Sequence, residues 1–164
     1  KRDYPKAFSY LKKSQSIQPR SFKIQHAIAR NFLKFANSQG TLSLAEPLFR
    51  KGENLMKQLI YSNEYYIEKA KSFSVSSYVS EKVRYIELFA VKITNKELNE
   101  MRDMLKSVYS ETDPYILDAM QKFYHLLEKK EKLSLLRMNL TDPYLEMIKN
   151  SLGNREELDE ESFY

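Results

Sequence analysis

Residues 3–35, DYPKAFSYLKKSQSIQPRSFKIQHAIARNFLKF, predict two helices that face each other across a short turn at residues 18–21. One face of the first helix carries Ala7, Leu11 and Ser14, and one face of the second carries Ile28 and Phe32. Residues three or four positions apart lie on the same side of a helix, and small side chains allow a second helix to come close. The stretch is therefore typical of an antiparallel helical hairpin.

Capping residues mark where further helices begin. Serine, threonine and aspartate side chains accept hydrogen bonds from the free N–H groups of a first helical turn. We expect this role for Asp3, Ser21, Ser43, Thr94, Asp113 and Asp142. Glu46 and Glu97 each lie three positions after such a residue, which predicts two capping boxes. Pro5, Pro47 and Pro114 then fall in first turns, where a missing N–H is tolerated.

Two segments interrupt this pattern. Residues 37–40 predict a loop in which Gly40 can adopt a left-handed backbone. Residues 74–80 are rich in serine and suit either a helix or a short extended link, but the spacing of Val79, Val83 and Ile86 favours a helix that resumes by Ser76. No strand-like alternation persists anywhere, so the sequence predicts an all-α fold with seven to nine helices.

Composition narrows the class of protein. A chain of 164 residues suits one domain or one contiguous repeat array. It contains no cysteine, which excludes disulfides and thiolate metal sites. No signal peptide is visible, and no apolar run approaches the roughly 18 residues that span a membrane. We expect a cytoplasmic protein that binds no membrane. The chain starts at Lys1, not at a methionine, so we also expect it to be part of a longer protein.

The charge is divided unevenly along the chain. Residues 1–93 hold 17 Lys/Arg and 7 Asp/Glu, a net charge of +10, whereas residues 94–164 hold 10 and 15, a net charge of −5. A basic first half can attract nucleic acid or an acidic protein, and it can also be a solvated surface. The opposite signs of the two halves allow self-association, in which the basic start of one copy meets the acidic end of another.

One pattern of small and large residues repeats along the chain. It consists of a small residue, a large residue four positions later and a small residue three positions after that. It occurs at Ala7-Leu11-Ser14 and at Ala45-Phe49-Gly52, 38 residues apart, and more loosely at Ala119-Phe123-Leu126. Self-similarity at a period of about 20 to 50 residues is typical of helical repeats.

This pattern resembles the tetratricopeptide repeat family, whose unit is an antiparallel helix pair of about 34 residues. In the resemblance, residues 7–14 belong to the second helix of one unit, which Pro19 closes. Ile28, Ala29 and Phe32 match the first helix of the next unit, and residues 45–52 match its second helix. The chain departs from the family in lacking tryptophan and in carrying Ala29 where the usual residue is glycine.

The resemblance implies helical hairpins stacked as a right-handed solenoid. It is good for residues 3–60 and weaker afterwards, where a third unit uses residues 66–86 and a fourth uses residues 101–126. We accordingly expect hairpins in residues 1–93, further hairpins or a C-terminal helical cap in residues 94–153, and an acidic flexible tail in residues 154–164. The arrangement also resembles the C-terminal sensor segment of bacterial or archaeal STAND nucleotide-binding proteins and related phage-defence proteins.

Residues suited to catalysis or metal binding do not gather in the sequence. Arg20 and His26 have a spacing similar to the Arg-x4–6-His motif of HEPN ribonucleases, but Arg20 follows Pro19 in a turn, whereas that motif needs both residues on one helix. His125 is the second histidine, and no cluster of His, Cys or carboxylates supplies a full metal-ligand set. The three glycines form no phosphate-binding loop. We expect no enzyme activity, no cofactor and no metal.

The residues expected to bind a partner are basic or aromatic. Lysine and arginine attract an acidic protein or peptide, and tyrosine combines apolar area with a polar tip. The candidates are Lys12, Lys13, Lys23, Arg30, Lys34, Tyr65, Tyr66 and Tyr85. The sequence thus predicts a non-enzymatic helical module for protein–protein interaction; the alternative is a nucleic-acid-binding domain that uses the same basic half, with tyrosines stacking on single-stranded bases.

Overall fold

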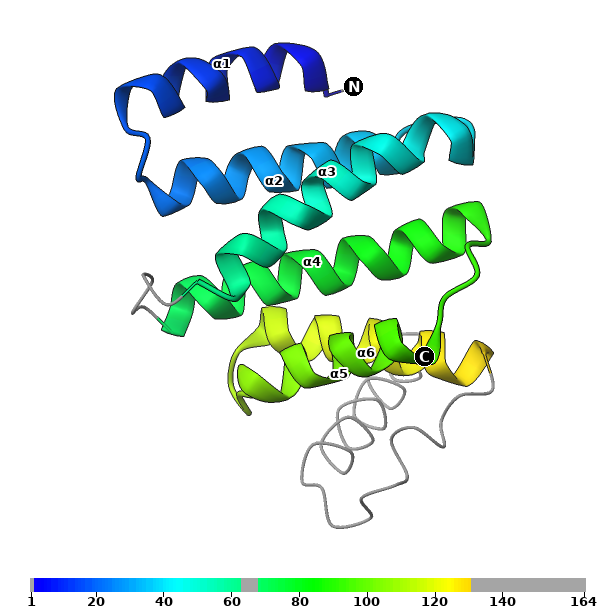
Figure 1. Cartoon of the computed structure of the whole chain (residues 1–164). Helices are drawn as coiled ribbons and strands as arrows, with labels where there is room; N and C mark the ends of the chain where they lie inside the picture. The colour runs from blue at the N-terminus through cyan, green and yellow to red at the C-terminus, as the bar shows by residue number, and fades with distance from the viewer. Residues whose placement is uncertain (1, 63–67, 131–164) are drawn as a thin grey trace, which may run out of the picture. The chain divides into compact units, whose positions relative to one another are not determined.

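Six α-helices and no strand occur in residues 2–62 and 68–130, which are the residues that the computed structural model describes (Figure 1). The all-α prediction is confirmed. The helices are α1 (Tyr4–Ile17), α2 (Phe22–Asn37), α3 (Leu42–Ile60), α4 (Glu68–Phe89), α5 (Asn95–Ser107) and α6 (Pro114–Lys129). The chain divides into two compact units, Lys1–Ile93 and Thr94–Tyr164.

Four of the predicted helix starts are confirmed. The Asp3 carboxylate accepts a hydrogen bond from the backbone N–H of Lys6, at 3.0 Å, and Ser21 caps α2 in the same way. Thr94 and Glu97 form the expected capping box at the start of α5. Asp113 accepts from two backbone N–H groups at the start of α6. These caps satisfy donors that the helix itself leaves without a partner.

The predicted capping box of Ser43 and Glu46 is wrong. Helix α3 begins earlier, because the N–H of Ala45 already bonds to the carbonyl of Thr41, at 3.1 Å. Glu46 therefore lies on the helix surface, where it pairs with Arg50. Pro47 lies inside the helix and not in its first turn. It cannot donate to the carbonyl four residues before it, so α3 lacks one backbone hydrogen bond there.

The left-handed backbone occurs at a different position from the one predicted. Gly40 does not have a positive φ; among the described residues, Ala90 does, at φ 49°. Ala90 directly follows α4, and the N–H of Val91 bonds to the carbonyl of Ile86, at 3.1 Å. This bond closes a Schellman-type helix end, a position that usually holds glycine.

The serine-rich segment at residues 74–80 does not interrupt a helix. Helix α4 runs through it from Glu68 to Phe89, so the helical alternative is confirmed and the extended link is excluded. Ser74 and Ser76 are buried, and both hydroxyls have partners: His26 for Ser74, and the carbonyl of Phe73 for Ser76. Because their hydroxyls are satisfied, these serines are tolerated inside the core.

Helix α2 is the centre of the first unit and contacts α1, α3 and α4. It runs antiparallel to α1, since Tyr4 stacks on Phe35 and Phe8 meets Phe32. It runs parallel to α4, since His26 meets Ser74 near one end and Asn37 meets Glu81 near the other. Figure 1 shows α1 and α4 on opposite sides of α2.

Helix α3 lies close to α2 at Gly52. A Cβ added there would lie 2.9 Å from two side-chain atoms of Leu33 and 3.0 Å from the carbonyl oxygen of Ala29. This lack of space explains why the sequence has a small residue at position 52.

Gly52→Ala should lower the free energy of unfolding by about 1 to 2 kcal/mol. Overpacking costs about 1 to 3 kcal/mol, and the better helix propensity of alanine returns up to about 1. Gly40→Ala is the matched control, because nothing lies within 4 Å of its added Cβ. Urea denaturation followed by circular dichroism measures both variants; equal stability of the two would contradict this packing.

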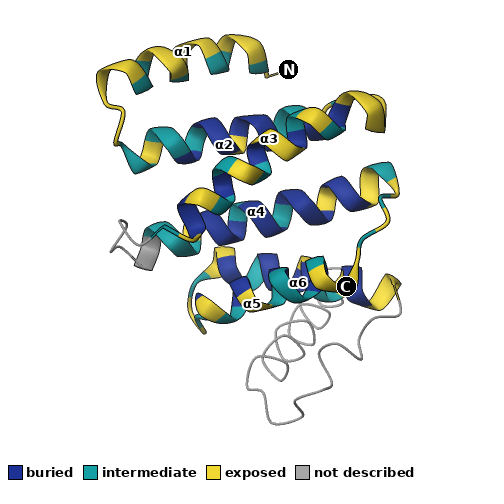
Figure 2. Ribbon diagram, viewed as in Figure 1, coloured by how far each residue is buried: buried dark blue, intermediate teal, exposed yellow. Residues whose placement is uncertain are grey.

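Helix α1 packs by one face only. None of its residues is buried, whereas α2 and α4 contain many buried residues (Figure 2). Its remaining surface is exposed, including Tyr10 and Ile17.

In the second unit, α5 and α6 each bury one face. The predicted stripes are confirmed: Leu98, Met101, Leu105 and Val108 are buried, as are Ile116, Ala119, Met120, Phe123 and Leu127. The predicted last helix after Asp142 and the acidic tail at residues 154–164 lie outside the described residues.

Candidate functional site

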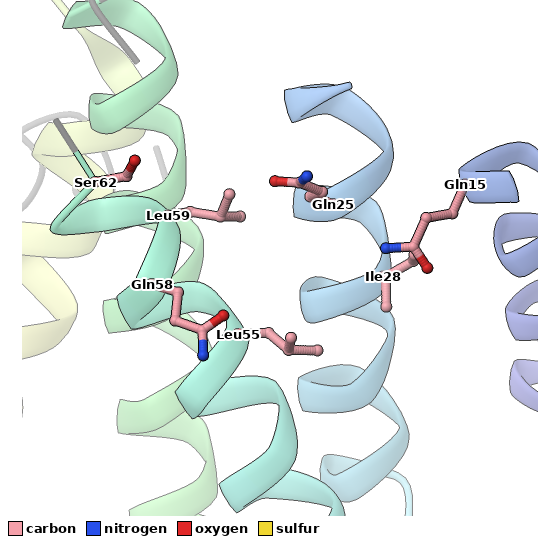
Figure 3. Close-up of a pocket in the computed structure, with 7 residues that line it drawn as sticks. All are labelled: Gln15, Gln25, Ile28, Leu55, Gln58, Leu59 and Ser62. Atoms are coloured by element: carbon pink, nitrogen blue, oxygen red, sulfur yellow. The ribbon is translucent and has the colours of Figure 1, made fainter. Parts of the chain in front are cut away.

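A pocket of about 310 Å³ opens between α1, α2 and α3 (Figure 3). Helix α3 supplies one wall, from which Leu55 and Leu59 point towards α2. The pocket is lined by Gln15 from α1, by Gln25 and Ile28 from α2, and by Leu55, Gln58 and Leu59 from α3. Ser62, which follows α3, completes the lining. Leucine and isoleucine thus form an apolar base, and three side-chain amides surround it.

The pocket's polar groups are uncharged. A glutamine amide has two donor hydrogens and an acceptor oxygen, so it can bond to both kinds of backbone group. The Gln25 amide donates one hydrogen bond to the carbonyl of Pro19, at 2.9 Å, which fixes its orientation beside the turn. No described residue of the lining is an acid, a base or a nucleophilic thiol. The arrangement therefore suits binding by hydrogen bonds and apolar contact.

Positive charge lies about one helical turn beyond the pocket. Phe8 and Phe32 meet edge to face, with ring centroids 4.8 Å apart. The Lys12 ammonium lies 5.4 Å from the Phe8 ring centroid, and the Lys51 ammonium lies 5.2 Å from the Phe32 ring centroid. Such cation–π contacts hold both lysines close to the two rings.

The two lysines and the pocket belong to one continuous surface. Lys12 precedes Gln15 by three residues, Phe32 follows Ile28 by four, and Lys51 precedes Leu55 by four. Residues three or four apart share a helix face. We call this surface, made of the seven pocket residues together with Phe8, Lys12, Phe32 and Lys51, the α1–α3 groove.

The structure separates the five basic residues predicted as partner contacts. Lys12 lies in the α1–α3 groove, while its neighbour Lys13 is exposed on the outer side of α1. Lys23 and Arg30 are exposed on α2, seven residues apart on one face. Lys34 forms an ion pair with Glu81, at 3.5 Å.

The prediction for Tyr85 needs correction. Tyr85 is buried, with 7% of its surface exposed, and its ring stacks on Phe49 with centroids 4.0 Å apart. Burial raises the pKa of its hydroxyl above the usual value. Tyr85 belongs to the core because its ring packs on Phe49 from α3. Tyr65 and Tyr66 lie outside the described residues.

Of the eleven groove residues, only Lys12 was predicted from the sequence as a partner contact. The polar residues among those missed include Gln15, Gln25, Lys51 and Gln58. Uncharged glutamines give no charge signal, and Lys51 lies outside the strongly basic first stretch. The signal present in the sequence was positional, since Lys51, Leu55, Gln58 and Ser62 recur every three or four residues on one face of α3.

A buried polar network joins α3 to α4. The Tyr78 hydroxyl donates to the Glu53 carboxylate, at 2.5 Å, and the Lys82 ammonium lies 2.9 Å from the same oxygen. Burial by itself raises the pKa of Glu53, but the charge of Lys82 and the hydrogen bonds from Tyr78 and Lys82 outweigh it, so this pKa lies below its usual value. None of these three residues lines the pocket between α1, α2 and α3.

His26 is buried in α2 and separated from Arg20, which lies in the turn after α1. Its Nδ1 lies 3.1 Å from the Ser74 hydroxyl, and its ring contacts Phe22 and Phe73. Burial, with a smaller contribution from the charge of Arg30, lowers the pKa of His26 to about 4. At neutral pH the imidazole is therefore uncharged.

Two other kinds of feature are absent from residues 2–62 and 68–130. No group of three His, Cys, Asp or Glu side chains is placed to hold a metal ion there. No helix in this part of the chain has the length and hydropathy of a membrane span.

Comparison of the chain with protein-family models, with curated proteins and with solved structures gives no match. The function of the chain is therefore inferred from the chemistry of the α1–α3 groove.

Proposed function

We propose that the first unit is a non-enzymatic protein-interaction module that holds an extended, acidic protein segment in the α1–α3 groove. The observation that carries this proposal is the pocket's lining of three glutamine amides around an apolar base. Each residue of an extended chain presents one N–H donor and one carbonyl acceptor. Amide side chains can satisfy both, whatever the sequence of the bound segment.

The charge at one end of the groove favours an acidic segment. Lys12 contacts Phe8 and Lys51 contacts Phe32, and the two rings contact each other, so both lysines lie at the same end of the groove. Neither lysine forms an ion pair within the described residues. An Asp or Glu one or two residues beyond the pocket would meet them. Ile28, Leu55 and Leu59 would contact an aliphatic side chain of the same segment.

The proposal includes repeat stacking of the tetratricopeptide kind. The antiparallel α2 and α3 would form one unit, α1 the second helix of the unit before it, and α4 the first helix of the unit after it. The parallel course of α2 and α4 and the close approach at Gly52 support this assignment. Continued through the chain, this repeat register would give a right-handed solenoid of seven to nine helices. We propose that the solenoid acts in the cytoplasm as the sensor or scaffold part of a larger protein.

Peptides selected by display against the protein should lose at least tenfold in affinity for Leu55→Ala/Gln58→Ala, because this variant removes apolar contact and an amide. Isothermal titration calorimetry measures the affinity, and circular dichroism verifies the fold. Asn54→Ala is the matched control on the same helix, since Asn54 is exposed and does not line the pocket. Affinity that falls equally in both variants would contradict the proposed site.

A peptide with the sequence of residues 154–164, NREELDEESFY, tests self-association in the same assay. Competition between it and the selected peptides would identify a second copy of this chain as an occupant. Failure to compete would leave a different protein as the partner.

A further inference from the structure

The α1–α2 hairpin has an unusual concentration of positive charge. Residues 4–45 contain seven lysines and arginines and no aspartate or glutamate. Lys34 is paired with Glu81 from α4. The other six are exposed: Lys6, Lys12, Lys13, Arg20, Lys23 and Arg30. Within the part of the chain that the structure describes, no ion pair neutralises them, so they combine into a strong positive potential.

The outer side of α1 arranges part of this charge around an aromatic ring. Lys6, Tyr10, Lys13 and Ile17 follow each other at intervals of three or four residues, which places them on one helix face. This face lies opposite the one that packs on α2 through Tyr4 and Phe8. Tyr10 is 61% exposed and Ile17 is 80% exposed. The Tyr10 ring is therefore accessible to a ligand and lies between Lys6 and Lys13 on this face. We call these four residues the outer α1 face.

We propose that the outer α1 face binds single-stranded nucleic acid. Lys6 and Lys13 lie about 10 Å apart along the helix axis, at about 1.5 Å per residue, and can each neutralise a phosphate. The ring of Tyr10 between them can stack on a base, since every base has a flat π-face. Arg20 in the adjacent turn extends the positive surface beyond Ile17.

The shape of this face favours a nucleic acid over a protein segment. It is the exposed side of a single helix, and none of its four residues lines the pocket between α1, α2 and α3. An extended peptide is better held by a concave site. A flexible polyanion needs only spaced cations and a stacking surface. The inference is independent of the α1–α3 groove, because the two surfaces share no residue.

Fluorescence anisotropy with labelled oligo(dT) and oligo(U) of about 15 nucleotides tests the proposal. Both should bind at about 50 mM salt, with an affinity that falls as salt rises, by a log–log slope of about −0.7 per phosphate contact. Lys6→Glu/Lys13→Glu should weaken binding at least tenfold. Tyr10→Ala should weaken binding about tenfold. Tyr10→Phe should bind with the affinity of the wild type, because phenylalanine also stacks on bases.

Two matched variants separate this site from net charge and from tyrosine content. Lys92→Glu/Lys96→Glu changes the charge by the same amount at two other exposed lysines, and Tyr115→Ala removes a tyrosine that is 64% exposed on α6. Both should bind like the wild type, and circular dichroism verifies that every variant is folded. Tighter binding of oligo(U) than of oligo(dT) would identify RNA as the ligand.

Each of the following results would overturn the proposal. The first is no anisotropy change with either oligonucleotide at low salt. The second is an equal loss in the Lys92→Glu/Lys96→Glu control, or wild-type affinity in Tyr10→Ala. The third is sedimentation of the wild type with phosphatidylserine vesicles without any oligonucleotide binding, which would assign the face to an anionic membrane surface.

Discussion

Lys82→Met should lower the free energy of unfolding by about 3 kcal/mol at pH 7, because it leaves the Glu53 carboxylate charged in a largely buried place. The side chains of Lys82 and Glu53 are only 6% and 19% exposed, with 2.9 Å between ammonium and carboxylate. The expected loss lies at the lower end for a broken buried pair, since the Tyr78 hydroxyl still donates to Glu53. Urea denaturation followed by circular dichroism provides the measurement.

A second variant isolates the cause of this loss. Glu53→Gln/Lys82→Met removes both charges and keeps an acceptor for the Tyr78 hydroxyl, so it should recover most of the stability. Arg50→Met is the matched control: it breaks the exposed pair with Glu46, which should change the stability by less than about 1 kcal/mol. If the double variant were as unstable as Lys82→Met, lost packing and not the unpaired charge would be responsible.

His26 should make the protein less stable as the pH falls below neutral. Its pKa is about 4 in the folded protein, where burial and then Arg30 lower it, against 6.5 for an ordinary histidine. Between these values the unfolded chain binds more protons than the folded one, so the free energy of unfolding decreases with decreasing pH. The expected loss is about 2 kcal/mol between pH 7 and pH 5 and about 3 kcal/mol by pH 4.

His26→Gln should flatten this dependence, because glutamine can still bond to Ser74 and does not titrate in the range. His125→Gln is the matched control: His125 is exposed, and its replacement should keep the wild-type profile. Melting temperatures at intervals between pH 7 and pH 5 provide the comparison. A profile as steep in His26→Gln as in the wild type would show that other groups cause the loss.

Local signals in the sequence predicted most of the helix starts. Asp3, Ser21, Thr94 and Asp113 act within one helical turn, so their role depends little on the rest of the fold. Ser43 does not act as a cap because α3 already begins at Leu42, with Thr41 in the capping position. The left-handed backbone at Ala90 could not be predicted, because this position after a helix usually holds glycine and the sequence has alanine there.

The candidate site was much less accessible to sequence reasoning. Lys12 and Lys13 are neighbours in the sequence, yet they lie on different surfaces because one residue rotates a helix by about 100°. Tyrosine is common at protein interfaces, but Tyr85 is buried because α4 packs on α3 at this position. The glutamines of the pocket come from three helices, and no local pattern predicts that they converge.

The most direct measurement is the affinity of a selected acidic peptide for two charge-reversed proteins that differ only in position. Lys12→Glu/Lys51→Glu reverses the charge at the end of the α1–α3 groove, and Lys6→Glu/Lys13→Glu makes the same change on the outer α1 face. We expect the first variant to lose at least tenfold in affinity and to recover it when the acids of the peptide are replaced by lysine. The second variant should bind the acidic peptide within about twofold of the wild type, because neither Lys6 nor Lys13 belongs to the groove and salt weakens interactions between exposed charges. Equal weakening of both variants, without recovery by the lysine peptide, would contradict binding in the groove.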